Sequence, residues 1–258
     1  MPADVVDEWA FPNRATPPGS AAYYAVRFSA DTRRQLNAYL LAWHALIREI
    51  SDRPHDPGVA RLKLDWWRQE ITATAEGSPR HPLLRALSRE ETGTTTASAM
   101  LCVVDAAERT LQTPQPTDDL AFADACRDDQ GTLFHLLASV DTDAAADASA
   151  NLDAGGYCSA IARIQHVARR PDLLPADCGA EQLRTLSAGQ RTERIEALLA
   201  ALAPGHLAQA RSSEVGMRLA ALARALHEKL RRSGYAVHPE LIDRAPLAKL
   251  WTAWRAAR

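Results

Sequence analysis

The sequence lacks cysteine pairing motifs and an excess of basic residues. The chain of 258 residues contains four cysteines, Cys102, Cys126, Cys158 and Cys178. They show no CxxC spacing, which argues against a zinc cluster or a disulfide framework and favours reduced thiols in a reducing compartment. A net charge of −2 provides no basic field for a phosphate backbone, so nucleic-acid binding is not expected.

No stretch of the chain resembles a targeting or membrane-spanning segment. The opening residues, MPADVVDEWAFP, lack the basic region and apolar core of a secretory signal. No apolar run reaches the roughly 18 residues needed to cross a bilayer. We therefore expect a soluble, cytoplasmic protein, with peripheral contact to a membrane left open.

Signals for β-strands are also scarce. Alternating β-branched runs are absent, whereas Ala, Leu, Arg and Glu, which favour helices, dominate. Residues 31–52 predict a helix that is capped by Asp31 and stopped by Pro54. Its apolar positions recur at spacings of three and four, at Leu36, Leu40, Trp43, Ile47 and Ile50.

A second helix is expected to begin at Asp56 and Pro57, a cap followed by proline in the first turn, and to end near Gly77. Its apolar positions cover a wide arc, which predicts a central helix: Val59, Leu62, Leu64, Trp66, Trp67 and Ile71. Further helices fit residues 82–90, 94–112, 117–140, 144–170, 180–202, 205–233 and 239–258. The sequence predicts a single all-α domain over residues 1–258, with an irregular N-terminal segment at 1–19.

Aspartates four residues apart occur three times. Two carboxylates at this spacing share one helix face and can hold Mg²⁺, a hard cation that prefers oxygen ligands. The pairs are Asp52/Asp56, Asp124/Asp128 and Asp143/Asp147. Chance alone supplies roughly one or two such pairs in a chain so rich in aspartate. Pro54 prevents the first pair from sharing a helix, and the other two are expected on solvated helix faces.

The segment LIREISD, residues 46–52, has two interpretations. Arg48 with Asp52, and Glu49 with Arg53, are i,i+4 pairs, each of which stabilises a surface helix by about 0.2–0.5 kcal/mol. Alternatively, Glu49 and Asp52 form a weakened acidic patch able to share one metal ion. Arg48 beside them opposes a cation but can itself bind a phosphate.

Other catalytic signatures are missing. His44, His135 and His166 have no HxxxH or HExxH partner, so we expect satisfied or exposed histidines rather than metal ligands. No serine or cysteine lies in a nucleophile-elbow context, and no glycine-rich phosphate loop is present.

The C-terminal stretch APLAKLWTAWRAAR is basic and amphipathic. Its apolar residues are Leu247, Leu250, Trp251 and Trp254, and its basic residues are Lys249, Arg255 and Arg258. A final core helix is the favoured interpretation, and contact with a membrane or a protein partner is the alternative.

Taken in order, segments covering nearly the whole chain resemble the squalene/phytoene synthase family. SAAYYAVRFSADTRRQLNAYLLAWHALIREISD resembles the opening, with Tyr23 four residues before Arg27, then a paired-arginine helix running into the first aspartate-rich motif. RLKLDWWRQEI followed by HPLLRAL resembles the next helix and helix start. FADACRDDQGTLFHLLA resembles the helix with a central glycine, here Gly131. AGGYCSAIARIQHVARRPDLLPAD resembles the second-motif segment and its closing turn, here Leu174, Pro175 and Asp177.

The resemblance implies an all-α isoprenoid-synthase bundle around a central cavity. Enzymes of the family join two prenyl diphosphates head to head, with Mg²⁺ held by aspartates on facing helices. In this chain Arg48 occupies the place of the first aspartate of the first motif, followed by Glu49 and Asp52. At the second motif, Val167 and Pro171 fall where aspartates belong. The resemblance also implies substrate-binding candidates, namely Tyr23, Arg27, Arg33 and Arg34.

These losses resemble those of non-catalytic relatives that include a mitochondrial assembly factor for respiratory complex I. Those relatives carry a tryptophan–arginine pair near the C-terminus, as Trp254 and Arg255 do here. The leading hypothesis is therefore a divergent member without prenyl transfer that binds an isoprenoid-like ligand or a protein partner.

Two alternatives stay open. The first is an active, magnesium-dependent head-to-head prenyltransferase that binds prenyl diphosphates with relocated carboxylates. It requires Glu49 and Asp52 to face other acids across the cavity, from the set Asp124, Asp128 and Asp129. The second is a helical scaffold or assembly factor, docked through its C-terminal helix, with a filled interior.

Overall fold

The computed structural model describes residues 8–52, 56–90, 94–141, 147–202, 213–238 and 240–256. Within these ranges every regular element is a helix, which confirms the predicted all-α class. The α-helices are α1 (Ala21–Arg27), α2 (Asp31–Asp52), α3 (Pro57–Ala75), α4 (Pro82–Leu87), α5 (Thr94–Gln112), α6 (Asp119–Cys126), α7 (Thr132–Ser139), α8 (Ala148–His166), α9 (Ala180–Thr185), α10 (Ala188–Ala200), α11 (Glu214–Arg232) and α12 (Pro246–Arg255). A π-helix, η1 (Arg127–Gly131), joins α6 to α7, and the 3-10 helices η2 (Pro171–Leu173) and η3 (Ala176–Cys178) follow α8.

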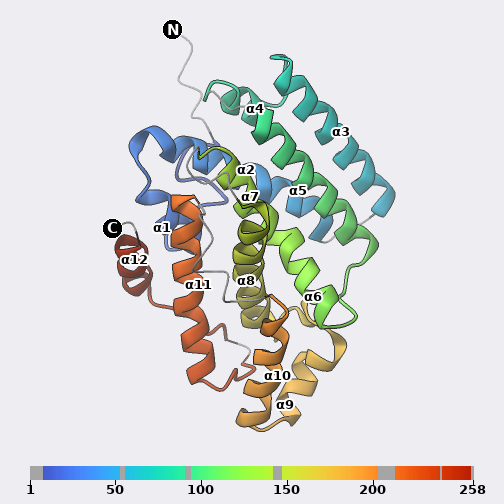
Figure 1. The fold of residues 1–258 in the computed structure, drawn as a ribbon, viewed down its shortest axis with the longest axis vertical. Coiled ribbons are helices and arrows are strands. Elements are labelled where there is room, and N and C mark those ends of the chain that lie inside the picture. The colour runs from blue at the N-terminus through green and yellow to red at the C-terminus, as the bar shows by residue number, and fades with distance from the viewer. Residues whose placement is uncertain are drawn as a thin grey trace.

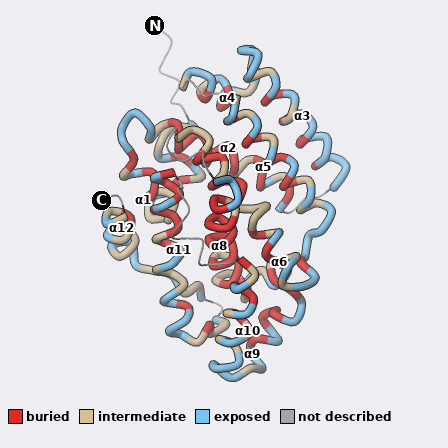
Figure 2. The backbone as a smooth tube through the Cα atoms, in the orientation of Figure 1, coloured by how far each residue is buried: buried red, intermediate tan, exposed pale blue. Residues whose placement is uncertain are grey.

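Helix α8 runs through the middle of the bundle (Figure 1). It packs against the π-helix, α6, α7 and α11, and residues 153–161 are all buried (Figure 2). Helix α5 packs on α2, α3 and α7, while α12 lies at the edge of the bundle beside α1 and α11. None of the described helices is both long and apolar enough to cross a membrane.

The first predicted helices have nearly the expected limits. Helix α2 buries the apolar stripe at Leu36, Leu40, Trp43 and Ile47, with Ile50 half-buried. Asp56 caps α3, where its Oδ1 accepts a hydrogen bond from the Gly58 amide at 2.7 Å. Asp52 and Asp56 therefore lie on different elements, as predicted from Pro54, which itself is outside the described residues.

Two details of these helices differ from the prediction. Asp31 is the first residue of α2, and its carboxylate pairs with Arg34 at 2.7 Å. Helix α3 is not central: Val59, Leu62 and Trp66 are exposed, because α3 packs against α2, α4 and α5 and leaves its opposite side uncovered.

Boundaries in the second half of the chain also differ. The helix predicted at 117–140 is interrupted by the π-helix, and that at 144–170 begins after its cap Asp147 and ends at His166. The helix predicted at 180–202 is divided in two, because Ser187 forms a capping box with Gln190 and starts α10 anew. Helix α11 begins at Glu214, with residues 203–212 outside the described ranges, and α12 spans only Pro246–Arg255. Helix α1 was not predicted.

Helix α8 and the π-helix cross in close backbone contact in the bundle centre. A Cβ atom on Gly155 would lie 2.1 Å from the Gln130 carbonyl oxygen, and one on Gly131 would lie 2.6 Å from the Leu152 carbonyl oxygen. Both obstacles are backbone atoms, so no side-chain rotation can relieve them. Glycine at both positions therefore allows the π-helix to lie directly against α8.

We expect Gly155→Ala to lower the free energy of unfolding by about 1–3 kcal/mol or more, because the added methyl group must separate two backbones. Gly189→Ala is the matched control, since a Cβ there meets nothing within 4 Å. It lies within α10, where Ala is favoured over Gly by up to about 1 kcal/mol. Urea unfolding followed by circular dichroism measures both, and equal stabilities for the two variants would contradict the close crossing.

Candidate functional site

Arg48 of α2 lies at the centre of the candidate site. The residue is 9% exposed, and its Nη2 lies 2.8 Å from Asp52 Oδ1, as the i,i+4 spacing predicted. Its Nε lies 3.2 Å from Oδ1 of Asp129 on the π-helix, and its Nη1 donates to Thr110 Oγ1 of α5 at 3.3 Å. Arg48 is therefore a buried arginine that links three elements, not part of a charged surface.

The Asp129 carboxylate has a second set of partners on α8. The Ser159 hydroxyl donates to Asp129 Oδ2 at 2.6 Å, and Arg163 Nη2 lies 3.9 Å from the same oxygen. Burial raises the pKa of Asp129, but the positive charges of Arg48 and Arg163 outweigh burial and hold this pKa below its usual value. Asp129 is therefore ionised, between two cations from different helices.

His44 completes the buried cluster. Its Nε2 lies 3.2 Å from the Asp129 backbone carbonyl oxygen, so this nitrogen carries the hydrogen and donates. Burial lowers the pKa of His44 to about 4, assisted by the nearby Arg48 charge and opposed by Asp129. His44 is therefore a neutral, hydrogen-bonded histidine, in agreement with the expectation of a satisfied side chain.

The other candidate carboxylates each face an arginine. Glu49 is directed away from the cluster and pairs with Arg14 at 2.7 Å, while its predicted partner Arg53 lies outside the described residues. The remaining pairs are Asp124 with Arg127 at 3.0 Å and Asp128 with Arg109 at 2.5 Å. Of the third aspartate pair, Asp147 caps α8, and Asp143 lies outside the described residues.

The residues at this position do not fit a magnesium cluster. In the described part of the chain, no group of three His, Cys, Asp or Glu side chains is placed to hold a metal ion. The Arg48 guanidinium, a fixed positive charge, instead lies between the carboxylates of Asp52 and Asp129. A divalent cation here would meet this charge at close range and lose the carboxylate oxygens it requires.

The two residues that the resemblance assigned to the second aspartate motif have no charged side chain. Val167 is buried just after the end of α8, and Pro171 begins η2. In the following turn Leu174 is fully buried, while the Asp177 carboxylate lies 2.9 Å from Arg194. Neither Val167 nor Pro171 supplies a carboxylate, whereas Asp172, next to Pro171, lines the same cleft as Asp52.

A polar cleft of about 420 Å³ opens beside the buried cluster. Its charged lining comprises Arg48, Arg109, Arg163 and Arg170 together with Asp52, Asp124, Asp128 and Asp172. Arg170, for example, lies 2.7 Å from Asp172. Positive and negative side chains are equal in number, so the cleft has no net charge with which to attract a free diphosphate.

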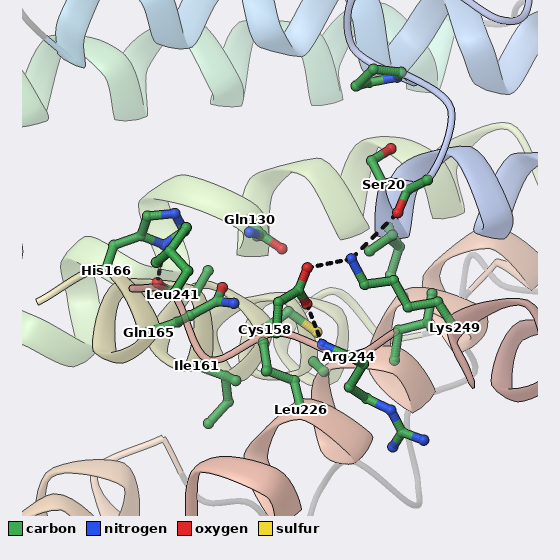
Figure 3. Close-up of a pocket in the computed structure, with 18 of the residues that line it drawn as sticks. Ser20, Gln130, Cys158, Ile161, Gln165, His166, Leu226, Leu241, Arg244 and Lys249 are labelled. Carbon is green, nitrogen blue, oxygen red and sulfur yellow. Dashed lines mark hydrogen bonds and ion pairs between the residues drawn. The ribbon is translucent and has the colours of Figure 1, made fainter. Parts of the chain in front are cut away.

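An apolar cavity of about 540 Å³ lies on the other side of α8, toward α11 (Figure 3). Its wall is formed by Cys158 and Ile161 of α8 and by Leu222 and Leu226 of α11. The rim includes the loop before α1, the segment before α12 and Lys249. Along the π-helix, Asp128 lines the polar cleft and Gln130 lines this cavity.

The four substrate-binding candidates lie away from both cavities, since none is among their lining residues. Arg27 donates to the Tyr23 hydroxyl at 2.9 Å. Arg33 donates to the Val140 carbonyl oxygen, and Arg34 donates to that of Ser29 at 3.1 Å.

Sequence reasoning missed Thr110, Ser159 and Arg163 as members of the cluster. One signal was available: Ser159 and Arg163 are four residues apart on a helix, and Arg163 Nε donates to Ser159 Oγ at 3.2 Å. The pattern identifies a polar face on α8 but not the element that it meets.

We expect Arg48→Gln to lower the free energy of unfolding by about 3–5 kcal/mol, because it leaves the buried Asp129 without its nearer cation. Arg109→Gln is the control: Arg109 has a 56% exposed side chain and its pair with Asp128 is half-solvated, so a loss of about 0–1 kcal/mol is expected. Urea unfolding curves compare the two. A loss in Arg48→Gln no larger than in Arg109→Gln would show that the buried pair contributes nothing.

The lowered pKa of His44 predicts that the folded protein becomes less stable as the pH falls. The unfolded chain protonates His44 near its ordinary pKa of 6.5, whereas the folded protein does so only near 4. The stability from neutral His44 is complete above pH 6.5 and decreases toward pH 4, by about 3 kcal/mol at 1.36 kcal/mol per pKa unit. The stability difference between wild type and His44→Asn should therefore narrow over this range, and a constant difference would contradict the assignment.

The comparisons with known proteins agree with this fold. The family model for squalene/phytoene synthase matches residues 16–251, whereas no curated protein matches the sequence. A crystal structure of a dehydrosqualene synthase in complex with ligand matches with a TM-score of 0.66, at 14% sequence identity, over 92% of this chain and 90% of that chain. This likeness shows that the predicted isoprenoid-synthase fold is correct. The family match covers most of the sequence, and the chain therefore belongs to the squalene/phytoene synthase family.

Proposed function

We propose that this chain binds an apolar, isoprenoid-like ligand in the cavity between α8 and α11 and does not transfer prenyl groups. The observation that carries the proposal is the position of Arg48, whose guanidinium lies between Asp52 and Asp129. An arginine in this place takes the carboxylate contacts on which a magnesium cluster would depend.

The chemistry of prenyl transfer explains why the loss of these carboxylate contacts would prevent the reaction. Ionising a prenyl diphosphate requires the charge of the departing diphosphate to be neutralised, which metal ions accomplish in enzymes that use them. The arginines of the polar cleft do not replace those ions, because their charges are already balanced by neighbouring aspartates. Arg109, for instance, contacts Asp128 through two hydrogen bonds, at 2.5 and 2.9 Å.

Ligand binding is supported by the apolar cavity. Its volume of about 540 Å³ is within the roughly 300–1,000 Å³ typical of small-molecule sites. Four leucines and Ile161 contribute to the wall, together with smaller residues such as Ala162 and Ala223. Gln130, Gln165 and His166 supply polar groups, and Asp243, Arg244 and Lys249 supply charged ones. Such a lining suits a branched hydrocarbon chain with a small polar end.

The same observations bear on the two alternatives. Relocated magnesium ligands would have to converge free of other cations. Asp52, Asp124 and Asp128 do line one cleft, but each is paired with an arginine, as is Glu49 with Arg14. The scaffold hypothesis expects a filled interior, so the apolar cavity favours ligand binding over it. Neither observation excludes a protein partner on the outer surface.

The proposal is tested by separating turnover from binding. Purified protein incubated with farnesyl or geranylgeranyl diphosphate and Mg²⁺ should yield no C30 or C40 product by mass spectrometry. Geranylgeraniol should bind equally well with Mg²⁺ and with EDTA in isothermal titration calorimetry. Formation of either product, or absence of geranylgeraniol binding, would overturn the proposal.

A matched pair of variants tests the location of the ligand. Ala223→Trp places a large side chain in the cavity wall and should weaken geranylgeraniol binding by at least about tenfold. Ala197→Trp makes the same change at an exposed position of α10 and should leave binding unchanged. Equal affinities in the two variants would place the ligand elsewhere.

A further inference from the structure

Helix α12 carries two large apolar side chains on the outside of the molecule. Leu247 is 78% exposed and Trp251 is 58% exposed, whereas Ala253 is buried and Leu250 and Trp254 are half-buried. The helix thus leaves part of its apolar surface uncovered, in contrast to the expected core helix. The spacing of Leu247, Trp251 and the half-buried Trp254 places the three along one outward stripe.

This outward stripe, Leu247–Trp251–Trp254, has a defined shape and charge. The rings of Trp251 and Trp254 lie 4.9 Å apart between centroids, so they present one continuous aromatic surface. Arg255 is exposed at the end of the stripe, and the helix contains two basic residues and no acidic one. Tryptophan and leucine on one side with basic residues beside them are typical of helices that lie in a membrane interface.

Helix α12 contacts the rim of the apolar cavity on the side opposite the stripe. Lys249 lies two residues from both Leu247 and Trp251 and lines the cavity. Its Nζ lies 2.6 Å from Asp243 Oδ2 and 3.3 Å from the Gly19 carbonyl oxygen (Figure 3). These contacts fasten α12 to both sides of the cavity rim. The stripe therefore faces away from the cavity and is open to an external surface.

We propose that the outward stripe of α12 binds the surface of a lipid membrane that contains anionic lipids. A second copy of the chain fits less well, because a stable dimer buries about 800 Å² on each partner, and even a fully buried tryptophan contributes only about 150–250 Å². A bilayer needs no matching surface, and the exposed Arg255 beside the stripe complements anionic headgroups. The proposal is independent of ligand binding.

Sedimentation with phospholipid vesicles tests the proposal. The wild-type protein should bind vesicles of phosphatidylcholine and phosphatidylglycerol, and should bind phosphatidylcholine vesicles several-fold more weakly. The double variant Leu247→Glu, Trp251→Glu should lose at least about tenfold in binding to the mixed vesicles. Both side chains are exposed, so the temperature of thermal unfolding should be unchanged. An unchanged temperature confirms that the variant is folded.

Leu120→Glu is the matched control, since Leu120 is 72% exposed on α6, away from α12. It should bind mixed vesicles as the wild type does, and an equal loss in both variants would overturn the proposal. Absence of vesicle binding by the wild type would also overturn it. So would a concentration-dependent dimer in sedimentation velocity that the double variant abolishes, because the stripe would then be covered by a second copy.

Discussion

The ionised carboxylate of Asp129 is the constraint on which the rest of this structure depends. A negative charge in the bundle centre is costly unless cations lie near it, and Arg48 from α2 and Arg163 from α8 meet this requirement. The protein thereby balances the charge of its centre with its own side chains. The family fold is kept, and a guanidinium lies between the carboxylates of Asp52 and Asp129.

The helices were predictable where local signals were strong. The apolar stripe of α2, the Asp56 cap and Pro57 defined the first two long helices, and the structure has them. The interruption near Arg127–Gly131 was not predictable, because a π-helix uses the same residue types as an α-helix. The outward stripe of α12 was misjudged for another reason: periodicity reveals that a helix has two sides but not which one faces the core.

The site was predicted in part. The Arg48–Asp52 pair follows from i,i+4 spacing, and the structure confirms it at 2.8 Å. Asp129, the more consequential partner, follows from tertiary packing alone, since it lies on an element far along the chain from α2. Its depressed pKa likewise depends on two arginines from other helices, whose charges outweigh the opposing effect of burial. A single sequence reveals neither the arginines' positions nor the burial.

The π-helix has a consequence for how the chain tolerates insertions and deletions. Its wider turn holds one more residue than an α-helical turn, which offsets α6 from α7 by about 100° relative to an unbroken helix. Within this segment Asp128 reaches Arg109, Asp129 reaches Arg48, and Gln130 faces the apolar cavity. Loss of a single residue would restore a regular helix and turn α6 out of phase with α7. Chain length at this segment is therefore as stringent a requirement as the identity of any side chain in it.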